Sequence, residues 1–180
     1  MKIEATALEG CFIIHDTIFA DSRGYFFESF NRNTFHTLTG IDANFVQDNQ
    51  SASMRGVLRG LHFQTGEFAQ AKLVRVLEGA VLDVAVDIRK DSPTFGQHVA
   101  IELSATSHTQ FYIPRGFAHG FLVLSERAVF FYKCDNFYNR QYEGGIMYND
   151  PALNIDWKMA DEDLILSDKD KQNPLLKDIL

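Results

Sequence analysis

The stretch Arg55-Gly-Val-Leu-Arg-Gly-Leu-His-Phe-Gln64 places two arginines and one histidine among apolar residues and glycines. If residues 57–64 form a strand, successive side chains point to opposite faces. Arg59 and His62 then lie on opposite faces, unless a bulge or twist near Gly60 turns one of them. The strand is therefore either a core element with a paired histidine or the floor of a binding site.

The chain has 180 residues, which predicts a single domain over residues 1–180 with a substantial core. Its 16 phenylalanines favour aromatic-packed sheet over helix. The net charge of -7 argues against a general nucleic-acid binder, which needs a basic field. We expect no membrane-spanning segment and no signal peptide. The two distant cysteines, Cys11 and Cys134, argue against a disulfide framework or a zinc site and indicate the cytoplasm.

Short strand patterns recur along the chain and are separated by glycine turns. We expect an aromatic strand at 25–30, a strand at 45–49, and a helix at 33–38 that is capped by Asn33 or Thr34 and ends at Gly40. Residues 72–77 and 80–88 predict two strands joined as a hairpin at Glu78-Gly79. The remaining expectations are strands within 1–20 and at 98–103, 110–113, 121–124 and 128–134, turns at 21–24 and 114–120, and a short helix near 161–164.

Many short strands without long helical patterns predict an all-β fold, an antiparallel sandwich or barrel with a few short helices. A cupin-type jelly roll suits the number of strands. Because one fold supports many activities, the function has to be inferred from particular residues.

Two of the six histidines, His62 and His119, lie in glycine-flanked segments beside apolar strands. Taken alone, each fits a core or solvated histidine slightly better than a catalytic one. The pattern Pro114-x-Gly-x-x-His119 matches half of the motif pair that holds a metal in cupins. The other half normally supplies His-x-His and a glutamate, but here it reads His62-Phe-Gln64, so a ligand is missing. The sequence thus resembles a cupin without its metal, whose histidines are free to act as bases.

A more specific resemblance runs in register from about residue 21 to residue 170. The chain resembles the dTDP-4-dehydrorhamnose 3,5-epimerases in the segments Phe45–Ser51, Val57–Gln64, Ala69–Val74, Asp83–Gly96 and Ile113–Phe121. The resemblance implies a metal-free enzyme that needs no cofactor and acts on a nucleotide-linked 4-keto-6-deoxy sugar. It also implies a homodimer in which an N-terminal strand of one chain helps to complete the sheet of the other.

The resemblance also implies roles for single residues. His62 is the base, Asp170 orients it, Lys72 stabilises the enolate, and Tyr132 is the acid. Taken alone, Lys72 also fits a solvated strand end and Tyr132 a core tyrosine with a satisfied hydroxyl. Tyr138 falls where an aromatic ring stacks on thymine, and arginine suits pyrophosphate. The substrate contacts implied are Arg23, Glu28, Gln47, Asn49, Arg59, His119, Tyr138, Glu143 and Lys169.

Three other functions stay open. A related enzyme could epimerise only C3 or only C5, or isomerise the ketone, and its product would distinguish it. A non-catalytic sugar-binding jelly roll is disfavoured by the set His62, Lys72, Tyr132 and Asp170, because a binding site needs no acid and base. A metal-dependent cupin oxygenase is disfavoured by the missing ligands. The function predicted is the 3,5-epimerase reaction in L-rhamnose synthesis for surface polysaccharide.

Overall fold

The computed structural model describes residues 1–179, in which short strands are the main regular structure. The strands are β1 (Lys2–Ala5), β2 (Phe12–His15), β3 (Phe19–Asp21), β4 (Gly24–Phe26), β5 (Gln47–Met54), β6 (Leu58–Gln64), β7 (Lys72–Glu78), β8 (Ala80–Asp87), β9 (His98–Ser104), β10 (Thr109–Ile113), β11 (Phe117–Val123), β12 (Arg127–Cys134) and β13 (Glu143–Gly145). The helices are α1 (Arg32–Thr39) and the short 3₁₀ helices η1 (Gly66–Phe68), η2 (Arg140–Tyr142), η3 (Asp161–Asp163), η4 (Asp170–Gln172) and η5 (Leu176–Asp178).

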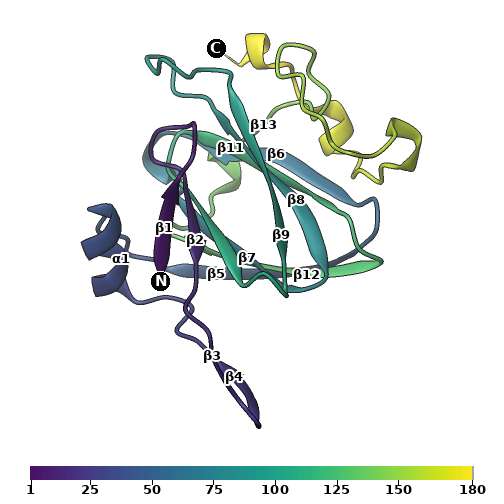
Figure 1. The fold of residues 1–180 in the computed structure, drawn as a ribbon. Coiled ribbons are helices and arrows are strands. Elements are labelled where there is room, and N and C mark those ends of the chain that lie inside the picture. The colour runs from purple at the N-terminus through teal and green to yellow at the C-terminus, as the bar shows by residue number, and fades with distance from the viewer. Residues whose placement is uncertain (180) are drawn as a thin grey trace.

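The strands form two main antiparallel sheets that pack face to face (Figure 1). One sheet has six strands in the order β1-β2-β10-β7-β12-β5, and the other has five in the order β13-β6-β11-β8-β9. From β7 to β12 the chain passes between the two sheets several times. β7, β10 and β12 lie in the six-stranded sheet, and β8, β9 and β11 lie in the five-stranded sheet. This arrangement confirms the predicted all-β jelly roll.

Three apolar cores hold these layers together. The first lies between the sheets and includes Val74, Phe111 and Phe130. The second lies on the outer face of the five-stranded sheet, where the segment after β13 covers it with side chains such as Trp157. The third packs Phe35 of α1 against the outer face of the six-stranded sheet. The inter-sheet core fills only part of the sandwich, so space remains between the sheets for a site.

An extra residue in β6 sets the direction of the side chains in the opening stretch. In the pairing of β6 with β11, Arg59 lies opposite Phe121 and His62 lies opposite His119. The three residue steps from Arg59 to His62 on β6 therefore face the two steps from Phe121 to His119 on β11, which is the geometry of a β-bulge. The bulge reverses the alternation, and both Arg59 and His62 line one cavity. The bulge or twist considered near Gly60 is confirmed.

The bulge requires glycine on both strands. Gly60 has φ of +134°, and a Cβ there would lie 2.6 Å from the Cα of Gly120 and 2.9 Å from the carbonyl oxygen of His119. A Cβ on Gly120 would lie 2.8 Å from the carbonyl oxygen of Arg59. Only glycine allows the two backbones to approach this closely.

The predicted hairpin of residues 72–77 and 80–88 is wrong. β7 pairs with β10 and β12 in one sheet, whereas β8 pairs with β11 and β9 in the other. The chain changes sheets at Gly79, which has φ of +78° and leaves no room for a Cβ beside the carbonyl oxygen of Arg127. The short spacing fits a corner between sheets as well as a hairpin, because β8 is buried on both faces and takes its partners from later strands.

Several predicted boundaries also differ from the observed ones. The aromatic strand ends at Phe26 instead of residue 30, and the strand expected at 45–49 spans β5, Gln47–Met54. Helix α1 is capped by Asn31, whose side chain accepts a hydrogen bond from the Thr34 amide, and it ends at Gly40 as predicted. The expected turn at 114–120 is shorter, because β11 begins at Phe117 and holds His119 within a strand.

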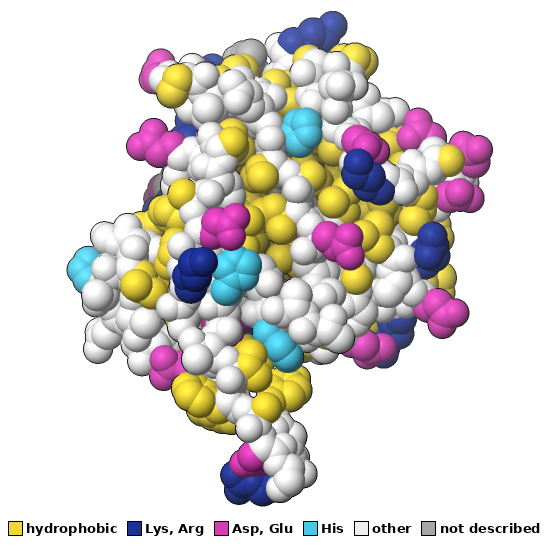
Figure 2. Space-filling model, viewed as in Figure 1, with side chains coloured by type: hydrophobic (Ala, Val, Ile, Leu, Met, Phe, Trp, Pro, Cys, Tyr) yellow, Lys and Arg dark blue, Asp and Glu magenta, His cyan; other side chains and the backbone are white. Residues whose placement is uncertain are grey.

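One hairpin projects from the sandwich. We call β3, β4 and their turn, residues 19–26, the arm (Figure 1). Phe19, Tyr25 and Phe26 on the arm are all more than 60% exposed. Figure 2 shows apolar side chains gathered on this projection and charged ones at its end. Such a large exposed apolar surface on a projecting segment is typical of a contact with another molecule.

Candidate active site

Two adjoining cavities open between the sheets. Their volumes are about 600 Å³ and about 320 Å³, and both are lined by Asn49, His62, Lys72 and Tyr132. We call the two together the central pocket. Its walls come from both sheets and from the C-terminal segment 165–170, so residues far apart in the sequence meet there.

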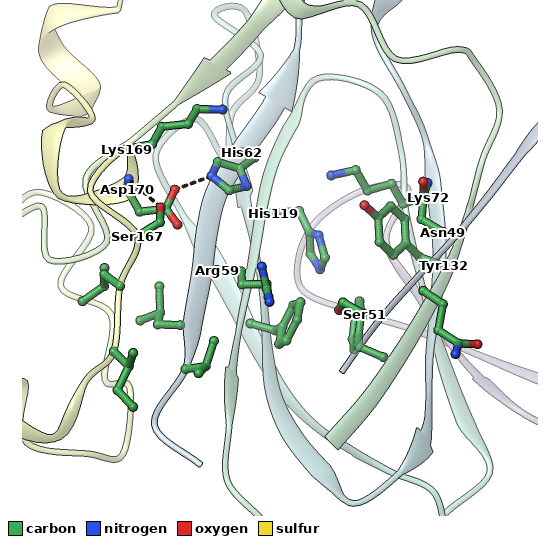
Figure 3. Close-up of a pocket in the computed structure, with 17 residues that line it drawn as sticks. Asn49, Ser51, Arg59, His62, Lys72, His119, Tyr132, Ser167, Lys169 and Asp170 are labelled. Atoms are coloured by element: carbon green, nitrogen blue, oxygen red, sulfur yellow. Dashed lines mark hydrogen bonds and ion pairs between the residues drawn. The ribbon is translucent and has the colours of Figure 1, made fainter. Parts of the chain in front are cut away.

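A histidine–aspartate pair occupies one wall of the central pocket (Figure 3). His62 Nε2 lies 2.5 Å from Asp170 Oδ1, and the Asp170 side chain is 5% exposed. Burial alone would raise the pKa of Asp170, but hydrogen bonds from His62 and Ser167 hold that pKa below its usual range. Asp170 therefore stays ionised and favours an orientation in which the other nitrogen of His62 can take a proton.

Lys72 and Tyr132 lie on the opposite wall, on strands β7 and β12 of the six-stranded sheet (Figure 3). The Lys72 ammonium lies 5.8 Å from the centre of the Tyr132 ring. Burial lowers the pKa of Lys72. Burial, together with Cys134, raises the pKa of Tyr132, which therefore keeps its proton near neutral pH. This wall can donate a proton and can stabilise a negative oxygen.

A second histidine–aspartate pair lies deeper in the sandwich. His119 Nε2 is 3.0 Å and 3.1 Å from the two carboxylate oxygens of Asp83, which is fully buried on β8. Burial lowers the pKa of His119, although Asp83 opposes this shift. His119 also lines the central pocket. Because its Nε2–H is donated to Asp83, the neutral ring offers its other nitrogen as a hydrogen-bond acceptor.

Further polar side chains of the central pocket are held in place by hydrogen bonds and an ion pair. Arg59 donates two hydrogen bonds to Ser53 Oγ, at 3.1 Å and 3.2 Å. Lys169 Nζ lies 2.5 Å from Glu143 Oε2, which also accepts a hydrogen bond from the Tyr138 hydroxyl at 3.0 Å. Burial would raise the pKa of Glu143, but these two partners lower it overall.

Most of the predicted site residues therefore come together. Gln47, Tyr138 and Glu143 line the smaller cavity, and Arg59, His119, Lys169 and Asp170 line the larger one. Two predicted contacts do not join them. Arg23 lies on the arm, 88% exposed and 2.6 Å from Asp21, and Glu28 lies beside Asn31, which donates to it at 3.2 Å. Neither lines a cavity of the central pocket within this chain.

Asp83 and Ser167 were missed by the sequence reasoning. The signal for Asp83 was a carboxylate within the apolar run Ala80-Val-Leu-Asp-Val-Ala-Val, where a charge needs a partner. The signal for Ser167 was the pattern Ser167-x-x-Asp170, which is typical of a capped turn. Within residues 1–179, no group of three or more His, Cys, Asp or Glu side chains is placed to hold a metal ion. No helix in that range is long and apolar enough to cross a membrane.

A jelly roll that holds a histidine–aspartate pair opposite a lysine and a tyrosine has the groups that an acid–base enzyme of the cupin type requires. The family model described as dTDP-4-dehydrorhamnose 3,5-epimerase matches residues 5–178, and the chain belongs to this family of isomerases. The predicted family is confirmed.

Individual relatives agree over their full lengths. The dTDP-4-dehydrorhamnose 3,5-epimerase of Salmonella typhimurium is 52% identical over 180 residues, which cover 100% of this chain and 98% of that protein. The crystal structure of the Elizabethkingia anophelis epimerase matches with a TM-score of 0.96 and 58% identity, over 99% of this chain and 97% of that one. The Legionella pneumophila enzyme, crystallised with dTDP-4-keto-L-rhamnose, matches with a TM-score of 0.94 and 50% identity, over 98% and 93% of the two chains.

The lowered pKa of Lys72 generates a stability prediction. Folding disfavours the charged form of Lys72 and so lowers the free energy of unfolding. This destabilisation is largest at pH below the lowered pKa, and it declines as the pH rises through that pKa. We expect Lys72→Met to raise the free energy of unfolding at neutral pH by roughly 1 kcal/mol, measured by urea denaturation at fixed protein concentration.

The matched control is Lys133→Met on the same sheet. Lys133 Nζ lies 3.0 Å from both carboxylate oxygens of Asp48, so its removal should cost between 0 and about 1 kcal/mol. A Lys72→Met protein that is less stable than the Lys133→Met protein would show that the ammonium of Lys72 is well compensated where it lies.

Proposed function

We propose that this chain inverts C3 and C5 of dTDP-4-dehydro-6-deoxy-D-glucose and so forms dTDP-4-dehydro-L-rhamnose, in L-rhamnose synthesis for surface polysaccharide. The observation that carries the proposal is the placement of His62 with Asp170 on one wall of a cavity and Tyr132 with Lys72 on the other. Inversion at carbon needs a base on one face of the sugar and an acid on the other. The family membership and the ligand named for the Legionella relative support this substrate.

The C4 ketone makes the reaction possible without a redox step. It acidifies the protons on C3 and C5, and His62 removes one of them. The electron pair of that C–H bond moves into the new C=C bond, and the carbonyl electrons move onto O4. Lys72 stabilises the resulting enolate oxygen. Tyr132 then donates a proton to the opposite face, the ketone re-forms, and exchange with water returns both residues to their starting states.

The further polar groups of the central pocket have a role in binding. Arg59 lines the larger cavity and suits the pyrophosphate, because a guanidinium can donate two hydrogen bonds to one phosphate. The ring of Tyr138 is half-exposed, which suits the stacking on the thymine base that we assign to it. Gln47, Asn49, Glu143 and Lys169 line the central pocket and are assigned as further substrate contacts.

We also propose that the active form is a homodimer in which the arm of one chain reaches the partner. Two features support this assignment: the apolar exposure of Phe19, Tyr25 and Phe26, and the separation of Arg23 and Glu28 from the pocket of their own chain. In the dimer, Arg23 and Glu28 contact the substrate held by the other chain. Residues 1–180 act as a single domain, and the two free, buried cysteines fit the reducing cytoplasm.

Isotope exchange tests the reaction directly. With dTDP-4-dehydro-6-deoxy-D-glucose in deuterated water and chelator present, we expect NMR to show deuterium at both C3 and C5 of the L-configured product. His62→Ala should slow both exchanges by roughly 10²–10⁴-fold, because the base is lost. His36→Ala, which removes an exposed histidine of α1, is the matched control and should retain the wild-type rate.

The other outcomes identify the competing functions. Deuterium at only one carbon indicates a single-centre epimerase. No exchange in folded protein that binds the sugar indicates a binding module, and activity that chelator abolishes indicates a metal-dependent enzyme.

Subunit mixing tests the arm. Arg23→Ala and His62→Ala proteins should each be nearly inactive, but unfolding them together and refolding should restore about one quarter of wild-type activity. Random pairing makes half of the dimers mixed, and each mixed dimer has one pocket with both native residues.

The control for this experiment is a mixture of Lys72→Met and His62→Ala proteins. Both residues line the same chain's pocket, so no mixed dimer contains an intact site and activity should stay low. If the Arg23→Ala mixture also stays low, the arm does not serve the partner's pocket.

A further inference from the structure

Ser167 lies at the start of the turn that carries Asp170. Its hydroxyl oxygen accepts a hydrogen bond from the Asp170 amide at 3.1 Å, and its carbonyl oxygen accepts one from the Lys171 amide at 3.2 Å. The sequence Ser167-Asp-Lys-Asp170 has the spacing of a capping box, in which a serine and an acidic residue three positions later satisfy backbone amides. Here only half of that motif is made.

The acidic half of the motif is directed elsewhere. In a complete capping box, the carboxylate returns to the amide of the serine. Asp170 instead reaches across to strand β6, where Oδ1 lies 2.5 Å from His62 Nε2, and its side chain is almost completely buried. Ser167 therefore fixes the backbone from which this carboxylate projects toward His62, and its hydroxyl also helps to hold the pKa of that carboxyl down (Figure 3).

The segment before Ser167 is anchored independently. The Leu58 amide donates to the Ile165 carbonyl oxygen at 3.0 Å, and the Ile165 amide donates to the Gly56 carbonyl oxygen at 2.8 Å. Loss of the Ser167 hydroxyl therefore leaves the strand contact in place and frees only the turn that follows it. Its effect should be confined to the direction of Asp170.

We propose that Ser167 is a positioning residue for this reaction, which aligns Asp170 with His62 through the hydrogen bond to the Asp170 amide. The inference deepens the proposed function and rests on it for the kinetic tests. A carboxylate held in line with the imidazole favours the protonated ring that forms when His62 takes the substrate proton. Misalignment of that carboxylate by a small distance is enough to slow catalysis substantially.

Kinetics of three variants test the proposal. Ser167→Ala should lower kcat by roughly 10- to 100-fold with KM changed less than about threefold, because the transition state loses support and the substrate does not. Ser167→Thr keeps the hydroxyl and should restore most of the activity.

Ser104→Ala is the matched control for the capping bond. Ser104 Oγ accepts from the amide three residues later, Ser107, at the same 3.1 Å, and it lines neither cavity of the central pocket. This variant should keep the wild-type kcat and KM. In an Asp170→Asn background, Ser167→Ala should add less than about a twofold loss, because both changes act through one carboxylate.

An activity-independent measurement separates this proposal from the function. Proton NMR of the resting protein should show a low-field resonance from the short His62–Asp170 hydrogen bond, which Ser167→Ala broadens or shifts and Ser104→Ala leaves unchanged. A resonance unchanged in Ser167→Ala overturns the proposal. So does a rise in KM at constant kcat, which makes Ser167 a substrate contact, or full additivity with Asp170→Asn. Absence of epimerase activity in wild-type protein refutes the proposed function and leaves the NMR result valid.

Discussion

The whole active site depends on the close crossing of two backbones at Gly60 and Gly120. The extra residue of β6 at this point turns both Arg59 and His62 toward the central pocket. A regular strand would send one of them to the outer face, into the apolar layer under the C-terminal segment. The bulge thus makes this strand the floor of a site.

The site contains ionisable groups whose charged forms are disfavoured by burial. Lys72 and Tyr132 are placed where burial opposes their charged forms, and Asp83 is completely buried with His119 as its partner. The C-terminal segment has two tasks, because it covers the outer apolar layer and also delivers Asp170 to His62. Burial of the Lys72 charge costs stability, and such a cost is typical of functional sites.

The sequence predicts local features better than the pairing of strands. The strands β9, β10 and β12 and the end of α1 at Gly40 follow from alternation and from a glycine stop signal. The hairpin around Gly79 fails because spacing alone cannot tell a turn within a sheet from a corner between sheets. His119 was assigned to a turn because Pro114 and Gly116 precede it, although β11 already begins at Phe117.

The site could be predicted only in part, because it joins residues that are far apart in the sequence. His62 and His119 could be selected from their flanking residues, but Asp170 lies 108 positions after His62 and no local pattern joins them. Only the resemblance to a family supplied that pair. It also supplied Arg23 and Glu28, which lie outside the pocket of their own chain.

The central claim is that the base and the acid act on opposite faces of one enolate. Its most direct test is the Tyr132→Phe protein in deuterated water, followed by NMR of the sugar. The account predicts that His62 still removes and returns protons, so deuterium enters the substrate with retained configuration while inversion falls by roughly 10²–10⁴-fold. If exchange and inversion decline together, or if inversion continues at the wild-type rate, Tyr132 is not the acid on the second face.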